Sequence, residues 1–298
     1  MKANIEECIK KYELSDEAFE KQVDRYFNFL AMNVQKPEKP RLVLVGGQAG
    51  AGKTGLVATK NAELEGGAII IDQDEIRASF PEELYKEITE NYTDREEYLI
   101  LKPYVLKMRQ ALVDRARENK YNVIMETALQ VVHTFVPQIQ DFKDAGYTSE
   151  LSVISVPEVD CFLSTLNRYT YYLEKTGTCR RNTKTEPEMY IKLRKSLEEY
   201  QRIGIFENIE MYIRGENIHK PYRKIYSQKE NPEETPIQAF DRGQKMAFDL
   251  TRRNFKERSE KTREILKKFG ETDKLEQLSK IEETFDRLDD RRDSFEEL

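Results

Sequence analysis

One eight-residue motif constrains the fold of this chain more than any other feature. Its residues are Gly47, Gln48, Ala49, Gly50, Ala51, Gly52, Lys53 and Thr54, which complete the pattern GxxxxGK[ST]. An apolar run at 42–45 precedes the motif and a helical pattern at 53–61 follows it. In this setting backbone N–H groups face phosphate oxygens, Lys53 reaches the β and γ oxygens, and Thr54 holds Mg²⁺. The motif predicts a triphosphate site rather than a glycine-rich turn without a ligand.

The sequence around the motif is typical of an α/β protein. Short apolar runs, which indicate strands covered on both faces, alternate with amphipathic helical patterns. The runs predict strands at 42–45, 68–71, 123–125 and 151–156, and helices at 53–61, 95–120, 135–144, 157–174 and 187–202. A closing hairpin or edge is predicted at 209–213 and 222–226. Together they predict a P-loop NTPase- or kinase-like, doubly wound, mostly parallel sheet flanked by helices, with ligands at the carboxyl ends of the strands.

Both ends of the chain are predicted to be helical extensions. The first segment indicates two helices with a break at Ser15, which is suited to an N-cap. Residues 241–298 carry 15 basic and 16 acidic side chains, yet they keep an apolar seam of Leu275, Leu278, Ile281, Phe285 and Leu288. We therefore predict N-terminal helices at 1–40, a kinase core at 41–236 and a charged helical extension at 237–298. The extension is either an internal inhibitor packed on the core or a solvated addition.

Composition limits the classes of partner. The net charge of -6 argues against a general nucleic-acid-coating surface, so phosphate recognition must be local. No apolar run has the length of a membrane span, and the first residues lack the apolar core of a secretory signal, so no membrane partner and a cytoplasmic location are expected. The three cysteines match neither a disulfide framework nor a metal pair and are expected to be free thiols.

Carboxylates follow two further predicted strands. Asp72 and Asp74 come directly after the strand at 68–71, which is a candidate neighbour of the P-loop strand. A kinase for a hydroxyl acceptor needs a carboxylate there to take the proton. We favour Asp74 as the base and Asp72 as a structural residue or one near Mg²⁺, the alternative being solvated strand-end residues. Glu126 follows the strand at 123–125 and is expected to bind an acceptor hydroxyl or a metal-bound water, unless it is a surface or helix-capping residue.

Arginines lie later in the sequence. Arg168 falls on the helix predicted at 157–174, and Arg180 and Arg181 follow in a segment near 175–186 that contains Gly and Thr. A helix arginine and a loop arginine suit a lid that neutralises γ-phosphate charge in the transition state. Each taken alone is more typical of a surface charge than of a phosphate clamp.

These motifs resemble the zeta toxin family, the toxin halves of bacterial toxin–antitoxin pairs. The resemblance rests on GGQAGAGKT, IDQDEIR, IMET, NRYTYY and RRNTK in this order, and it runs from about Ser15 to about Tyr226. It implies a kinase that transfers the γ-phosphate of ATP or GTP to the 3′-hydroxyl of the amino sugar of UDP-N-acetylglucosamine, which blocks synthesis of cell-wall precursors. It also implies a helical antitoxin partner.

The resemblance assigns roles to individual residues. It implies Asp74 as the general base, Lys53 as the P-loop lysine, Glu126 as a substrate ligand, and Arg168 and Arg181 as phosphate clamps. Thr127 is expected as a further substrate ligand, although the family commonly reads Glu-Gly-Thr where this chain reads Glu126-Thr127-Ala128, so its hydroxyl comes one position early. Arg77 has a helical spacing from Asp74 and is expected to pair with it or to contact substrate phosphate.

Two other functions fit the same residues. One is a kinase for another hydroxyl acceptor, such as a nucleoside, an antibiotic or a polynucleotide 5′-end. The other is a nucleotide-dependent switch whose charged helices bind a protein partner. A switch needs no acceptor-side base, so the set of Asp74, Glu126, Arg168 and Arg181 favours catalysis.

Overall fold

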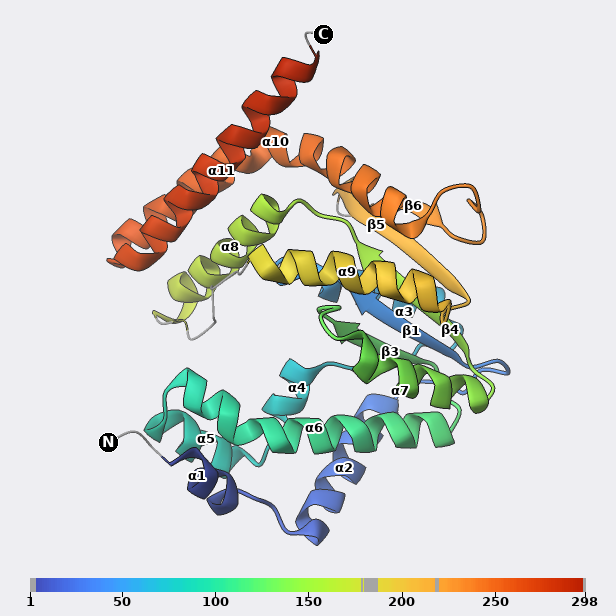
Figure 1. Cartoon of the computed structure of the whole chain (residues 1–298). Helices are drawn as coiled ribbons and strands as arrows, with labels where there is room; N and C mark the ends of the chain where they lie inside the picture. Colours follow the sequence, from blue (N-terminus) through green and yellow to red (C-terminus); the bar gives the residue numbers. More distant parts are fainter. Residues whose placement is uncertain (1–3, 178, 180–186, 218–219, 297–298) are drawn as a thin grey trace. The chain divides into compact units, whose positions relative to one another are not determined.

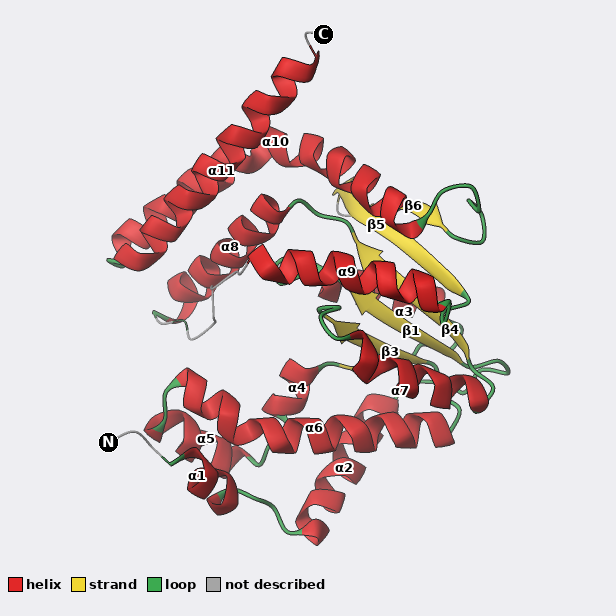
Figure 2. Ribbon diagram, in the orientation of Figure 1, coloured by secondary structure: helices red, strands yellow, loops and turns green. Residues whose placement is uncertain are grey.

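Six strands form one sheet, in the spatial order β2-β3-β1-β4-β5-β6. The computed structural model describes residues 4–177, 179, 187–217 and 220–296. Figure 2 shows the strands in yellow and the helices around them in red. The strands are β1 (Arg41–Gly46), β2 (Ile69–Ile71), β3 (Val123–Thr127), β4 (Thr148–Ile154), β5 (Asn208–Asn217) and β6 (Lys220–Ser227). The fold is the predicted α/β type with a mostly parallel sheet.

The helices follow the predicted order, with two additions. They are α1 (Ile5–Lys11), α2 (Asp16–Ala31), α3 (Lys53–Glu63), α4 (Gln73–Ala78), α5 (Glu82–Asn91), α6 (Asp94–Glu118), α7 (Val132–Asp144), α8 (Glu158–Thr176), α9 (Pro187–Ile203), α10 (Pro236–Lys268) and α11 (Thr272–Glu296), labelled in Figure 1. Helices α4 and α5 were not predicted from the sequence. The first spans less than two turns, too short for a periodic pattern to show.

Strand pairing confirms one expectation and corrects another. β2 pairs in parallel with β3, β4 pairs in parallel with β5, and β5 and β6 form the predicted antiparallel hairpin. The candidate placement of β2 beside the P-loop strand β1 is wrong, because β3 lies between them. β2 has three residues and one strand neighbour, and a strand this short suits the edge of a sheet.

The chain divides into two packing units. The first comprises Met1–Leu44, Val57–Glu126 and Gln138–Ser149, and the second comprises Val45–Leu56, Thr127–Pro137 and Glu150–Leu298. In the first, α1, α5 and α6 share an apolar cluster that includes Cys8, Tyr12, Ile88, Ile100 and Leu101. The break at Ser15 is confirmed, since its Oγ accepts a hydrogen bond from the N–H of Ala18 and caps α2. The predicted division at residues 40 and 236 stays a prediction.

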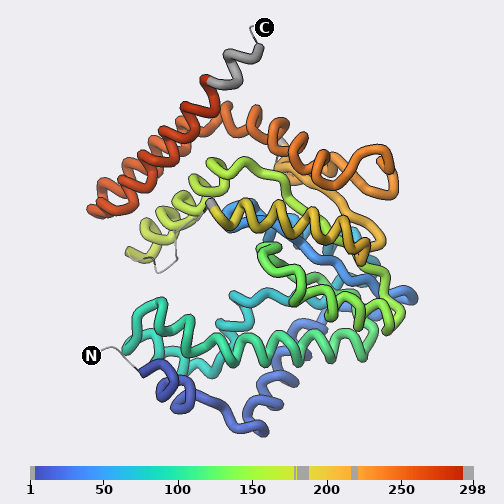
Figure 3. Tube along the Cα trace, in the orientation of Figure 1, coloured from blue at the N-terminus to red at the C-terminus, as the bar shows by residue number. Residues whose placement is uncertain are grey.

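The extension of the second unit is packed against α8. Helices α10 and α11 share with α8 a cluster whose buried members include Leu166, Phe255, Leu266, Leu278 and Phe285. The rings of Phe255 and Phe285 stack with centroids 3.8 Å apart. The predicted seam therefore finds its partner surface within this unit, and the path of the chain can be followed in Figure 3.

One residue of the seam was predicted wrongly. Leu288 keeps the helical spacing, but 41% of its surface is exposed. It lies near the carboxyl end of α11, where the adjacent Asp289 forms an ion pair with Arg252 of α10 at 2.5 Å, and its side chain points away from the apolar cluster. Among the described residues, no helix combines the length and apolar character required to cross a membrane.

Candidate functional site

The P-loop has the strand–turn–helix geometry that its sequence predicts. It connects β1 to α3, and Gly50 and Gly52 adopt positive φ angles of +80° and +97°. A Cβ atom on Gly50 would lie 2.1 Å from the backbone oxygen of Cys161 at the start of α8. Side chains are therefore excluded at Gly50 both by conformation and by contact, which keeps the loop backbone close to α8.

The N-terminal end of α3 supplies the donors for a phosphate group. Helix α3 begins at Lys53 and its N-terminal end carries partial positive charge, while the N–H groups of Gly55 and Leu56 donate to the carbonyl of Gly52. Lys53 Nζ lies 3.2 Å from the backbone oxygen of Gln48, within the loop, and Thr54 is exposed at the next position. This donor set fits a triphosphate with its cation. Over the described parts of the chain, no three acidic, His or Cys side chains gather in a way that could hold a metal ion.

The outer side of the P-loop is held by two residues that the sequence analysis missed. Arg214, near the carboxyl end of the hairpin strand β5, donates from Nε to the carbonyl of Ala51 at 3.2 Å and from Nη2 to the carbonyl of Gly50. Tyr222 on β6 donates its hydroxyl to the carbonyl of Gly52 at 2.6 Å. The carbonyls of three consecutive loop residues therefore accept hydrogen bonds from side chains of β5 and β6.

Arg214 is oriented by a buried carboxylate. Its Nη1 lies 2.9 Å from Oδ2 of Asp160, a residue of α8 that is 5% exposed. Arg258 of α10 reaches the other oxygen of Asp160 at 2.6 Å and donates to Ser164 Oγ at 2.8 Å. Burial alone would raise the pKa of Asp160, but the two guanidinium groups outweigh it and hold the pKa below its ordinary value. Asp160 is therefore an anion that binds two arginines.

On the first unit, the two strand-end aspartates have different local roles. Asp72 caps α4, since its Oδ1 accepts from the N–H of Asp74 at 2.8 Å. Asp74 lies on α4 with its carboxylate largely exposed, 3.7 Å from Arg77. The pairing of Arg77 with Asp74 is thereby confirmed. The Arg77 guanidinium also lies over the ring of Tyr98, 5.4 Å from its centroid, which limits its freedom.

Glu126 and Thr127 end β3. Glu126 is half-buried, while Thr127 is 8% exposed and its hydroxyl accepts from the N–H of Leu129 at 3.1 Å. The carbonyl of Thr127 accepts from the N–H of Gly47 at 3.3 Å, which ties the end of β3 to the P-loop within the second unit. Thr127 is engaged with the loop backbone, and its role as a substrate ligand stays a prediction.

A half-buried arginine of α6 contacts the residue that precedes Glu126. Arg109 donates to Gln138 Oε1 at 2.9 Å and lies 3.5 Å from the sulfur of Met125. Burial lowers its pKa, although a guanidinium remains charged at neutral pH. The sequence analysis missed Arg109 because it lies in the middle of a long helix, away from any strand end.

The predicted arginine pair is only partly described. Arg168 lies on α8, as expected, and its side chain is exposed. Arg180 and Arg181, with most of the predicted lid near 175–186, lie outside the described residues. The structure therefore brings one of the two predicted clamps into the second unit together with the P-loop, and the role of Arg181 stays a prediction.

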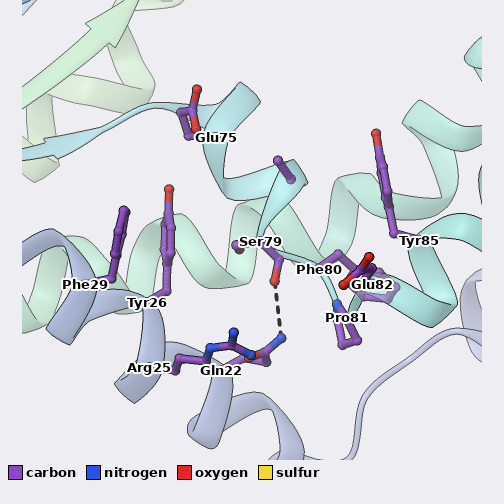
Figure 4. A pocket seen from close by; sticks show the side chains of 11 residues that line it. Gln22, Arg25, Tyr26, Phe29, Glu75, Ser79, Phe80, Pro81, Glu82 and Tyr85 are labelled. Atoms are coloured by element: carbon purple, nitrogen blue, oxygen red, sulfur yellow. Dashed lines mark hydrogen bonds between the residues drawn. The ribbon is translucent and has the colours of Figure 1, made fainter.

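A cavity of about 450 Å³ opens beside α4 within the first unit. Its lining comes from α2, α4 and the start of α5: Gln22, Arg25, Tyr26, Phe29, Glu75, Ala78, Ser79, Phe80, Pro81, Glu82 and Tyr85. Figure 4 shows the rings of Tyr26 and Phe29 side by side, with Glu75 on the opposite wall. Burial, together with the charges of Glu75 and Asp72, raises the pKa of Tyr26 to about 12, so its hydroxyl stays protonated at neutral pH.

The comparisons with known proteins all match members of one family. The Zeta toxin family model matches residues 23–227. The toxin zeta of Streptococcus agalactiae is 27% identical over 77% of this chain and 78% of its own length. The toxin PezT of Streptococcus pneumoniae serotype 4 is 30% identical over 73% of this chain and 83% of its own length.

A solved structure agrees with the sequence comparisons. A structure described as part of the PezAT chromosomal toxin–antitoxin system of Streptococcus pneumoniae superposes with a TM-score of 0.65 and 26% identity. It covers 78% of this chain and 89% of the matched chain. With the complete P-loop and the IDxD aspartates in place, these matches lead to one conclusion. The chain belongs to the zeta toxin family, whose members share this kinase-like fold.

Proposed function

We propose that this protein is a kinase that transfers the γ-phosphate of ATP or GTP to the 3′-hydroxyl of the amino sugar of UDP-N-acetylglucosamine. The observation that carries the proposal is the placement of Asp74. It lies on α4 directly after the Asp72 cap, with its carboxylate exposed and 3.7 Å from Arg77. A nucleotide switch has no use for an exposed carboxylate on the acceptor side.

The donor side belongs to the second unit. The N–H groups at the start of α3 and the Lys53 ammonium are proposed to bind the β- and γ-phosphates, and Arg168 and Arg181 to neutralise charge on the γ-phosphate. Thr54 would hold Mg²⁺, with Asp72 as a second candidate. When bound, the cation screens phosphate charge and favours attack by a hydroxyl oxygen.

The acceptor side belongs to the first unit. As the acceptor oxygen forms its bond to the γ-phosphorus, Asp74 takes the hydroxyl proton, and the bond between phosphorus and the β,γ-bridging oxygen breaks to release the nucleoside diphosphate. Glu126 is proposed to bind a second hydroxyl of the acceptor, with Arg77 close to acceptor phosphate. The cavity beside α4 has the size of a small-molecule site, about 300–1,000 Å³, and provides aromatic and charged surface for the remainder of the acceptor.

The biological role proposed here follows from the family. Phosphorylated UDP-N-acetylglucosamine no longer serves as a cell-wall precursor, so the free protein would act as the toxin of a toxin–antitoxin pair. The matched PezAT structure is described as a toxin–antitoxin system, which supports a separate antitoxin protein as the partner of this chain.

The acceptor can be identified by mass. The purified protein is incubated with ATP or GTP, Mg²⁺ and a panel of acceptors: UDP-N-acetylglucosamine, a nucleoside, an aminoglycoside and a 5′-hydroxyl oligonucleotide. We expect a gain of one phosphoryl group on UDP-N-acetylglucosamine. A gain on a different acceptor would replace the proposed substrate, and no gain on any of them with intact nucleotide binding would favour the switch.

A further inference from the structure

We infer that Arg258, a residue of the C-terminal extension, is a positioning residue for the nucleotide site. The inference rests on the proposed nucleotide binding and concerns how the P-loop is held in shape. Inhibition by the charged extension stays a prediction, and the extension is packed against α8 rather than a solvated addition. Its contacts within the second unit connect it to the backbone of the P-loop.

The connection has three links with short polar contacts. Arg258 Nη1 lies 2.6 Å from Oδ1 of Asp160, and Arg214 Nη1 lies 2.9 Å from Oδ2 of the same carboxylate. Arg214 in turn donates to the carbonyls of Gly50 and Ala51. The two oxygens of the Asp160 carboxylate therefore bind different arginines: Arg258 of α10 and Arg214, which binds the P-loop.

Burial gives these contacts their strength. The Asp160 side chain is 7% exposed, against 29% for Arg214 and 25% for Arg258. A carboxylate with so little exposure to solvent requires charged partners, because an unpaired buried carboxylate lowers the stability of the folded state. With Arg258 in place both oxygens are bound, so Asp160 and with it Arg214 have a fixed direction.

The extension has further anchors at the same point. Thr251 of α10 lies 3.4 Å from Oδ2 of Asp160, and Gln244 donates to the carbonyl of Val156 at 2.9 Å, just before α8. The apolar cluster of α8, α10 and α11 lies along the same helices. Arg258 is thus held by a packed helix rather than by a loose tail.

The consequence for the P-loop is geometric. A phosphate site needs the loop N–H groups to face the ligand, which requires the carbonyls to face away from it. Arg214 and Tyr222 bind three of these carbonyls. If Arg258 is lost, Asp160 keeps Arg214, Ser164 and Thr251 but loses the guanidinium on Oδ1. Arg214 is then less firmly directed and the loop samples more conformations, so nucleotide binds less tightly.

The test measures nucleotide affinity by titration calorimetry with a non-hydrolysable ATP analogue. Arg258→Gln keeps Asp160 paired with Arg214, so the variant is expected to fold. The control is Lys256→Gln, which removes a charge from an exposed position of the same helix. We expect Arg258→Gln to weaken binding about tenfold, the effect of losing one charge-assisted hydrogen bond, and Lys256→Gln to leave it within about twofold.

A double-mutant cycle separates positioning from general support. If Arg258 acts through Arg214, then Arg258→Gln should change affinity less than about twofold in an Arg214→Gln background. An equal loss in both backgrounds would overturn the inference, as would unchanged affinity in Arg258→Gln alone.

A second measurement covers the case in which the double variant does not fold. Hydrogen exchange of a peptide spanning residues 47–55 is compared between Arg258→Gln and Lys256→Gln without nucleotide. Faster exchange in Arg258→Gln supports the inference and equal exchange overturns it. If the unaltered protein binds no nucleotide, the proposed function fails, but this measurement still decides whether Arg258 stabilises the loop.

Discussion

Replacement of Gly50 by alanine should damage the P-loop far more than the addition of one methyl group suggests. Gly50 has a φ angle of +80°, which costs an alanine about 1–2 kcal/mol. The new Cβ would also lie 2.1 Å from the backbone oxygen of Cys161 and 2.7 Å from Thr165 Oγ1. The Cys161 oxygen belongs to a buried helix start and cannot move by a rotamer change, so the loop must shift.

A second glycine separates the two contributions. Gly204 also has a positive φ, +66°, but no atom lies within 4 Å of its Cβ position. Gly204→Ala should therefore cost about 1–2 kcal/mol from conformation alone. Gly50→Ala adds a close contact of the kind that costs about 1–3 kcal/mol, giving a total of about 2–5 kcal/mol.

The comparison needs one unfolding assay and one binding assay. The chain contains no Trp, so urea unfolding is best followed by circular dichroism. Gly50→Ala should unfold at a lower urea concentration than Gly204→Ala and should lose at least about tenfold in nucleotide affinity, while Gly204→Ala keeps its affinity. Equal stability loss and equal affinity in the two variants would refute the argument that close packing against α8 shapes the P-loop.

Three further predictions concern the second unit. Phe285→Ala removes a 1% exposed ring stacked on Phe255 and should cost about 3–5 kcal/mol in urea unfolding; a loss below about 1 kcal/mol would show that the extension is loosely packed. The folded pKa of Asp160 lies below its ordinary value of 3.8, so its contribution to stability is complete above pH 3.8 and is lost as the pH falls through the folded pKa. The free energy of unfolding of Asp160→Asn should therefore depend less on pH in the acid range. The same pH dependence as in the unaltered protein would contradict the ion pairs. Burial raises the pKa of the Cys161 thiol to about 12, so iodoacetamide at pH 8 should label the half-buried Cys179 before Cys161, as peptide mass mapping can check.

The features of the fold that could be predicted from the sequence are local ones. The P-loop, the alternation of apolar runs with helical patterns, the N-cap at Ser15 and the hairpin of β5 and β6 are all determined by short stretches of sequence. The position of β2 in the sheet could not be predicted in this way, because strand order depends on which apolar runs are covered on both sides. Leu288 shows the same limit, since its helical spacing matches the apolar seam of α11 but does not show that 41% of its surface stays exposed in the folded chain.

Candidate residues of the site could be predicted from the sequence where a charged residue follows a predicted strand. That rule indicated Asp72, Asp74 and Glu126, and applied to the run at 209–213 it would also have indicated Arg214. Asp160 and Arg258 have no such signal. They are charged residues at helical positions, 98 residues apart in sequence, and only the packing of α10 against α8 brings them together.

Phosphoryl transfer by Asp74→Asn tests the central claim most directly. This change keeps the size of the side chain and removes the group proposed to take the proton. With UDP-N-acetylglucosamine and ATP as substrates, we expect the rate to fall about 10²- to 10⁴-fold, the usual contribution of a general base, while nucleotide affinity by calorimetry stays within about twofold of the unaltered protein. Transfer at an undiminished rate in Asp74→Asn would contradict the account, because the acceptor-side carboxylate would then have no part in the reaction.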